Sequence, residues 1–448
     1  LDTRSGWGGG KLNATSILLE PLTEDETREL IANLLSRATL PQEAATRIAD
    51  ATEGNPLFAE ELLAMLIDEG LLRREEGHWT AADELAELPV PPTIHALLAA
   101  RLEALPDDER ALLAHASVEG TLFHRGALEE LAPASLEASA ERSLTSLVRR
   151  DVIRPHRAGL GEDEAFRFRH MLIRDAAYRS LSKEMRADLH ERFAAWLVRT
   201  AGPRLGEFEE IVGYHLERAY RLLGELGTMD TDAEELAVRG AERLESAGRR
   251  ALARSDYPGA VSLLERAVAL FPDDHPRRVR LLPDLGAALI EAGRLADAAV
   301  ELAEASRAAA GARDDCAAAR ALVQQEFLRL RGESAGTAEG LAVVEQVVPV
   351  FEPDGDDYGL CYAFRLRAWL HWIEAQAEAA AGAWERAAEY ARRAGAEHER
   401  TEILSWVANS LFLGPTPVAE GIRRCEAIRS EAAGNLAAAA HVPQSLAG

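Results

Sequence analysis

Residues 236–272 read LAVRGAERLESAGRRALARSDYPGAVSLLERAVALFP, and this stretch decides the fold. Its apolar residues return every three or four positions, which is the period of an α-helix with one buried face. Pro272 stops the second helical run, because proline cannot continue a helix. Part of the pattern returns 38 residues further on, so that Gly248, Ala260, Leu264 and Ala267 are followed by Gly286, Ala298, Leu302 and Ala305.

These residues resemble the tetratricopeptide repeat, a helical hairpin of about 34 residues. Glycine or alanine at the repeated positions lets the two helices of a hairpin approach backbone to backbone. A degenerate third copy contains Gly382, Ala387 and Ala394, and residues 316–353 are expected to form another hairpin. We therefore predict a mainly α fold with tetratricopeptide-like helical repeats over residues 236–448. Helical hairpins of another type are the alternative.

The composition favours helices packed on helices and argues against whole-molecule binding to polyanions. The chain has 448 residues, enough for about three domains. Its formal net charge of −25 repels nucleic acid and anionic lipid. No apolar run reaches the ~18 residues of a membrane span, and the three cysteines lack metal-site spacing. We expect a soluble, cytoplasmic protein with reduced thiols and no membrane contact.

The first hundred residues are predicted to form a helical domain over residues 21–105. Thr23 and Glu26 have the spacing of a capping box, so a helix is expected to start there. Gly54-Asn55-Pro56 separates two helical stretches, with Pro56 at the first position of the second helix. Residues 70–79 suggest a small hairpin, and Thr93 is expected to cap a helix over residues 94–105. Residues 1–20, with the apolar run Ile17-Leu18-Leu19, are interpreted as the remnant of a P-loop nucleotide-binding core.

Residues 106–183 are predicted to form a winged helix, and residues 184–235 to be connecting helices. Helical stretches over about 107–119, 124–132 and 135–150 precede two short apolar segments near 151–155 and 165–169. Three helices followed by a two-stranded hairpin make this domain. The wing lies in a basic island, but acidic residues such as Glu162, Asp163 and Glu164 are interleaved with it. We therefore expect no direct nucleic-acid binding.

The chain offers no self-contained catalytic site. Gly6-Trp7-Gly8-Gly9-Gly10-Lys11 fails as a P-loop, because Ser5 stands where glycine is needed and Leu12 where serine or threonine is needed. The histidines lack metal-ligand spacing, and no nucleophile motif is present. We predict no catalytic residues and no metal site, although a longer parent protein is compatible with ATPase or nucleotide cyclase activity.

Three segments together resemble the ATPase module of the signal-transduction ATPases with numerous domains, the STAND proteins. They are GNPLFAEELL (54–63), PPTIHALLAARL (91–102) and FRFRHMLIRDAAY (166–178). The resemblance is strongest to bacterial proteins that carry this AAA-type module between a class III adenylate or guanylate cyclase-like domain and tetratricopeptide repeats. It extends over nearly the whole chain.

The resemblance implies a nucleotide switch that binds ATP or ADP with Mg²⁺. Its helical lid contributes a Gly-x-Pro motif beside the adenine, which here corresponds to Gly54, Asn55 and Pro56. Its winged helix contributes a histidine near the phosphates, which corresponds to His170. The chain departs from the family because the Walker A and Walker B segments, which supply the phosphate-binding lysine and the Mg²⁺ ligand, are absent. We therefore expect this chain by itself to bind nucleotide weakly at most and not to hydrolyse ATP.

The resulting function is the regulatory portion of an ATP/ADP-switched signalling ATPase, in an adenylate or guanylate cyclase-linked protein, whose repeats bind a protein partner. Two alternatives remain open. One is an ATP-dependent transcription activator with a helix-turn-helix output domain outside this chain. The other is a repeat scaffold with a degenerate, nucleotide-free module.

Overall fold

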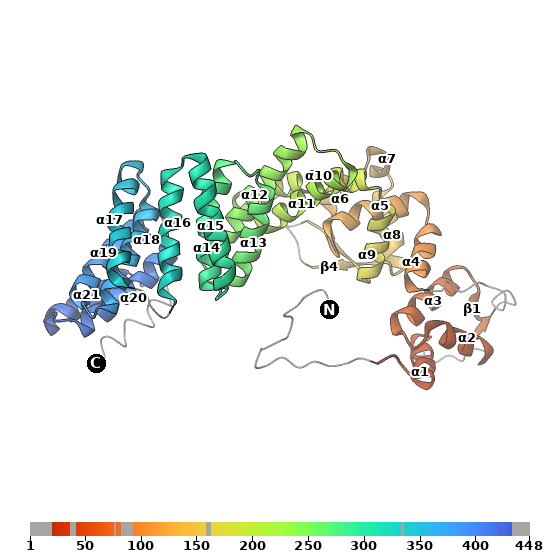
Figure 1. The fold of residues 1–448 in the computed structure, drawn as a ribbon. Helices are drawn as coiled ribbons and strands as arrows, with labels where there is room; N and C mark the ends of the chain where they lie inside the picture. Colours follow the sequence, from red (N-terminus) through yellow and green to blue (C-terminus); the bar gives the residue numbers. More distant parts are fainter. Residues whose placement is uncertain are drawn as a thin grey trace. The chain divides into compact units, whose positions relative to one another are not determined.

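A computed structural model describes residues 20–35, 42–75, 78–81, 93–157, 163–332 and 336–431. The chain divides into two compact units, Leu1–Ser182 and Lys183–Gly448 (Figure 1). Helices dominate both units, which confirms the mainly α prediction. The expected strand at Ile17-Leu18-Leu19 and the glycine-rich Gly6–Lys11 segment lie outside the described residues. The finer division into five domains stays a prediction.

The first unit opens with helices and a short hairpin that share one core. The capping box is present: the Thr23 side chain accepts a hydrogen bond from the Glu26 amide, and Glu26 accepts one from the Thr23 amide at 2.8 Å. Thr93 caps the fourth helix as expected. The core centres on Ile31, Leu62 and Leu97. The elements are α1 (Glu24–Leu34), α2 (Gln42–Thr52), α3 (Pro56–Asp68), β1 (Leu72–Glu75), β2 (His78–Ala81) and α4 (Ile94–Glu103).

The remainder of the first unit contains a three-stranded antiparallel sheet of order β3-β5-β4. The third strand was not predicted, because it is only three residues long. It belongs to the sheet because it pairs with β5 in the antiparallel direction. Phe123 is fully buried, and its ring centroid lies 5.7 Å from that of Phe166 and 5.3 Å from that of Phe168. The elements are α5 (Asp107–Glu119), β3 (Leu122–His124), α6 (Arg125–Leu131), α7 (Ala134–Glu137), α8 (Ala140–Arg149), β4 (Ile153–His156), β5 (Ala165–Phe168) and α9 (Met171–Ser180). The single helix expected over 135–150 is thus divided at Ala138 and Ser139.

The second unit consists of helices in which each packs on the next along the chain. Among the described residues, no helix is long and apolar enough to cross a membrane. A 3₁₀ turn at Gly202–Arg204 separates the first two helices. The helices are α10 (Lys183–Ala201), α11 (Leu205–Leu226), α12 (Thr231–Leu252), α13 (Tyr257–Leu270), α14 (Pro276–Glu291), α15 (Leu295–Ala312), α16 (Asp315–Leu330), α17 (Thr337–Asp354), α18 (Asp357–Ile373), α19 (Ala377–Arg393), α20 (Glu397–Leu413) and α21 (Val418–Glu431).

The repeated glycines lie where the two helices of a hairpin touch. A Cβ atom on Gly248 would lie 2.6 Å from Leu264 Cδ2, and one on Gly286 would lie 2.4 Å from Leu302 Cδ2. Both leucines are fully buried and have little room to move away. The hairpins α12–α13 and α14–α15 therefore pack as the tetratricopeptide pattern predicts, and α16 and α17 form the further hairpin expected over residues 316–353.

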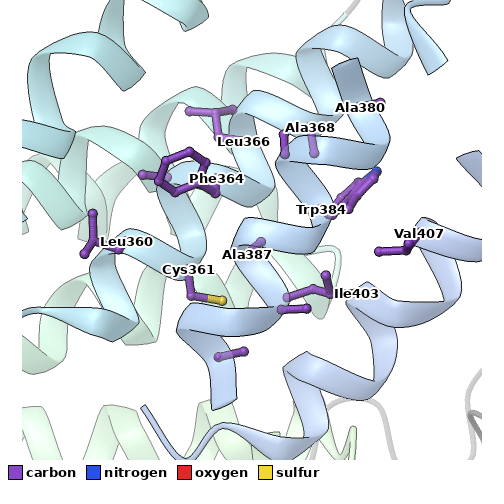
Figure 2. Close-up of a cluster of buried hydrophobic side chains, with 14 of the residues drawn as sticks. Leu360, Cys361, Phe364, Leu366, Ala368, Ala380, Trp384, Ala387, Ile403 and Val407 are labelled. Atoms are coloured by element: carbon purple, nitrogen blue, oxygen red, sulfur yellow. The ribbon is translucent and has the colours of Figure 1, made fainter. Parts of the chain in front are cut away.

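In the hairpin α18–α19, an alanine and a tryptophan take the place of the glycine and leucine at the contact between the two helices. The positions that correspond to Gly286, Ala298, Leu302 and Ala305 are all fully buried, and they are Ala368, Ala380, Trp384 and Ala387 (Figure 2). Of the residues assigned to the third copy, Ala387 is fully buried. The predicted register is wrong, because Gly382, Ala387 and Ala394 have the spacing of Gly293, Ala298 and Ala305, whereas Ala387 corresponds to Ala305 in the structure. Gly382 is exposed, and a Cβ there would meet nothing within 4 Å. Ala394, also assigned to the pattern, is the exposed C-cap of α19.

The two glycines provide a matched test of the hairpin contact. Gly382→Ala in α19 should raise the free energy of unfolding by about 0.5–1 kcal/mol, because alanine is the better helix former and space is open. Gly286→Ala should be less favourable than Gly382→Ala by about 1–3 kcal/mol, because its methyl group overlaps Leu302. Urea titrations followed by tryptophan fluorescence would measure both. Equal effects of the two substitutions would contradict the assigned contact.

Candidate functional site

Gly54, Asn55 and Pro56 form the corner between α2 and α3. Gly54 has φ +72°, and its carbonyl oxygen accepts a hydrogen bond from the Leu22 amide at 2.8 Å. A Cβ there would lie 2.1 Å from the Leu22 carbonyl oxygen, so only glycine fits. Asn55 is the N-cap of α3, and Pro56 takes the first helical position as expected. Each of the three residues therefore has a structural role that is independent of any ligand.

His170 lies between β5 and α9 and faces the first turns of α3. Its Nε2 atom is 3.7 Å from Glu60 Oε2 and 3.6 Å from Glu61 Oε1. Glu60 is four residues beyond Pro56, or about 6 Å along the helix axis. The structure thus brings the predicted histidine close to the helix that the Gly-Asn-Pro corner begins, although they are more than a hundred residues apart in sequence.

Ion pairs surround the histidine. Arg169 pairs with Glu60 and with Asp151, and its Nε donates a hydrogen bond to His170 Nε2 at 3.2 Å. Arg101 on α4 pairs with the buried Glu61. Burial raises the pKa of the Glu61 carboxyl more than the nearby Arg101 lowers it. Burial also lowers the pKa of His170, and the positive charges of nearby arginines, Arg169 first among them, lower it further. His170 is therefore a neutral ring that accepts a hydrogen bond.

This arrangement does not fit a phosphate group. The carboxylates of Glu60 and Glu61 lie beside the imidazole nitrogen, and they would repel a negatively charged phosphate group placed there. The Arg169 guanidinium already has carboxylate partners. The Asn55 side chain accepts from the amides of Leu57 and Phe58 at the start of α3, which are the groups that would otherwise meet an anion. His170 contacts α3 about one turn beyond the Gly-Asn-Pro corner, and the groups around it do not by themselves make a phosphate site.

The lowered pKa of His170 has a consequence for stability. The unfolded chain has a histidine pKa of about 6.5, so the folded protein binds this proton less readily. The contribution of His170 to the free energy of unfolding is fully present above about pH 6.5. It is lost as the pH falls through the pKa of His170 in the folded protein. An NMR titration, with the His170 signal identified by its loss in His170→Gln, should give a midpoint below 6.5. A midpoint at or above 6.5 would contradict the assigned surroundings.

The second unit has a larger candidate site, a groove on one side of the first helices of successive hairpins. We call it the inner groove. It has a volume of about 410 Å³ and is lined by residues of α14, α16, α18 and α20, together with Leu252 and Tyr257. The aromatic residues in its wall are Tyr257, Phe327, Tyr358, Tyr362 and Trp369, and its ionisable residues include Asp284, Glu291, Arg331, Arg365, Glu399 and Glu402.

Internal ion pairs hold most of these charges in place. Arg365 pairs with Glu402 at 3.2 Å, and Arg331 pairs with Glu291 at 3.2 Å. Burial raises the pKa of Tyr358 and of Tyr362, so both phenols stay neutral and can donate hydrogen bonds. Within the described part of the chain, no group of three or more His, Cys, Asp or Glu side chains has the geometry to hold a metal ion. The inner groove has the composition of a binding site: aromatic walls with a few placed polar groups.

Sequence reasoning missed the inner groove, although a signal for it is present. Tyr358, Tyr362 and Arg365 are spaced i, i+4 and i+7, so they share one face of α18. On an amphipathic helix, bulky polar residues on such a stripe point to a second, functional face. The repeat pattern that predicted the fold consists of small residues, which allow the two helices of one hairpin to come close together. It therefore gives no information about the large residues on the groove face.

Comparisons with known proteins give limited matches. Residues 23–79 match the family described as a domain of unknown function, DUF8739. No curated protein matches the chain. Among solved structures, a STAND protein with a tetratricopeptide repeat sensor from Pyrococcus horikoshii is 13% identical at a TM-score of 0.34, covering 95% of this chain and 68% of its own.

Two other solved structures are similar at the same low level. A Rap protein in complex with competence and sporulation factor is 11% identical at a TM-score of 0.33, covering 93% of this chain and 97% of its own. Yeast Tom70 is 12% identical at a TM-score of 0.20, and the match covers 87% of this chain and 96% of Tom70. Similarity at this level transfers no function to the present chain.

Proposed function

We propose that the second unit binds a protein partner through the inner groove. The observation that carries this proposal is the groove itself: about 410 Å³ of space lined by five aromatic side chains and by buried polar groups. Pockets of ~300–1,000 Å³ with such linings are the usual binding sites of small ligands and short segments. The tetratricopeptide-like hairpins stack so that α14, α16 and α18 are neighbours, which makes the groove continuous.

We further propose that the chain is the regulatory portion of an ATP/ADP-switched signalling ATPase of the STAND type, in an adenylate or guanylate cyclase-linked protein. The three sequence segments that resemble this family support the proposal. So does the closeness of His170 to the first turns of α3, because the family places its histidine and its Gly-x-Pro motif at one site. Residues 106–183, which include helices α5, α6 and α8 and a three-stranded sheet, are the proposed winged helix.

Groove binding is tested by blocking the groove. Peptides selected on the whole chain from a random display library should bind at least about tenfold more weakly to Ala287→Trp, because Ala287 lines the groove and an indole would fill it. Val300→Trp is the control, since Val300 on α15 is 65% exposed and is not part of the groove lining. Fluorescence anisotropy would measure binding, and circular dichroism would check folding. Equal binding to wild type and Ala287→Trp would contradict the proposal.

The nucleotide proposal is tested on the chain as it stands. Titration with ADP and Mg²⁺ in a calorimeter should show no micromolar binding, because His170 faces carboxylates and Arg169 is already paired. Adenosine, which has no phosphate, serves as the control for contacts to the nucleoside alone. A micromolar dissociation constant for ADP would contradict the assignment of phosphate binding to a separate P-loop domain.

A further inference from the structure

One polar side chain of the inner groove is buried and has no hydrogen-bond partner among the described residues. Gln324 on α16 is 7% exposed and lines the groove. Its amide offers both donors and an acceptor. The amide is not among the fully buried side-chain groups that lack a partner, so it reaches the space of the groove and is available to a ligand there. A peptide group has the matching set, one N–H and one carbonyl.

The charges of the lining favour a cation. Four carboxylates line the groove against two guanidinium groups, Arg331 and Arg365, which pair with Glu291 and Glu402. The third carboxylate, Asp284, pairs with Arg249 at 3.0 Å. Glu399 contacts the Tyr358 hydroxyl at 3.4 Å, and no described cation lies within ion-pair distance of it. Aromatic rings also attract a cation through their negative faces. The free negative charge in the groove is thus at Glu399, beside aromatic side chains.

A contact between Ser255 and His398 bounds one edge of the inner groove. Ser255 Oγ, in the turn after α12, lies 3.2 Å from His398 Nε2 at the start of α20. His398 lines the groove, so this contact joins the two ends of the wall. A volume of about 410 Å³ accommodates a few residues and not a folded surface.

We infer that the inner groove takes an extended peptide segment with one lysine or arginine, whose backbone pairs with the Gln324 amide and whose cationic side chain pairs with Glu399. This inference rests on the proposed function, that the groove binds a protein partner. It specifies the part of the partner that enters the groove.

The test uses the whole chain and a display library of random nonapeptides. Selected peptides should share one position enriched in lysine or arginine. Replacing that residue by glutamine should weaken binding to wild type about tenfold, and much less to Glu399→Gln, because the partner charge is then absent. The matched control is Glu378→Gln, which removes the same charge from an exposed position on α19 away from the groove.

A second variant addresses the backbone contact. Gln324→Ala should weaken binding of basic peptides and of their glutamine versions by a similar factor, because it removes a bond to the backbone and not to the charge. Preservation of the melting temperature would show that the variant folds.

The outcomes separate the inference from the function on which it rests. Selected peptides without a basic position, or with the same loss on Glu399→Gln as on wild type, would overturn the inference. If those peptides are still blocked by Ala287→Trp, the proposed function survives. If no peptide is selected, or if Ala287→Trp blocks none, both are overturned.

Discussion

The contact between a small residue on the first helix of a hairpin and a large apolar residue on the second is the constraint on which the second unit depends. Gly286 against Leu302 and the corresponding pair of Ala368 and Trp384 are two solutions to the same packing problem. The tryptophan solution has a cost, since the Trp384 Nε1 donor is buried without a partner among the described residues. Ring contacts with Trp369 at 5.6 Å and Trp406 at 6.0 Å offset part of that cost.

This contact also determines where function is possible. Because the small residues face the second helix of each hairpin, other faces of the first helices are free to carry large polar and aromatic side chains. In α18 the residues Ala368 and Trp369 are adjacent, one buried against α19 and the other in the wall of the groove. The groove therefore exists because the hairpin contact needs only one side of each helix.

Much of the fold follows from local sequence signals. The capping box at Thr23, proline at the first position of α3 and the repeat spacing of Gly248 and Gly286 each have a nearby physical cause that is visible in the sequence. Strand β3 was missed because three residues carry no periodicity, and its identity depends on pairing with β5, about forty residues away. The substitution of a glycine–leucine pair by Ala368 and Trp384 also hides the repeat from a search for glycine.

The sites were harder to predict than the fold. The family resemblance implies that Gly54, Asn55, Pro56 and His170 belong to one site, which stays a prediction. In the structure His170 lies beside Glu60 and Glu61 of α3, the helix that Pro56 begins. The sequence does not indicate that Glu60 and Glu61 would occupy the space beside the imidazole, because that depends on the approach of β5 and α9 to α3. The inner groove assembles side chains from four helices, and no local pattern records how close they come.

The contact between Ser255 and His398 joins residues that are 143 positions apart. A stack of helical hairpins is ordinarily a one-dimensional object, in which each repeat senses only its neighbours and can fray from either end. A contact between early and late repeats adds a restraint across the hairpins that lie between them. Its distance depends on the packing of each of those hairpins, so the loss or gain of one repeat would separate Ser255 from His398.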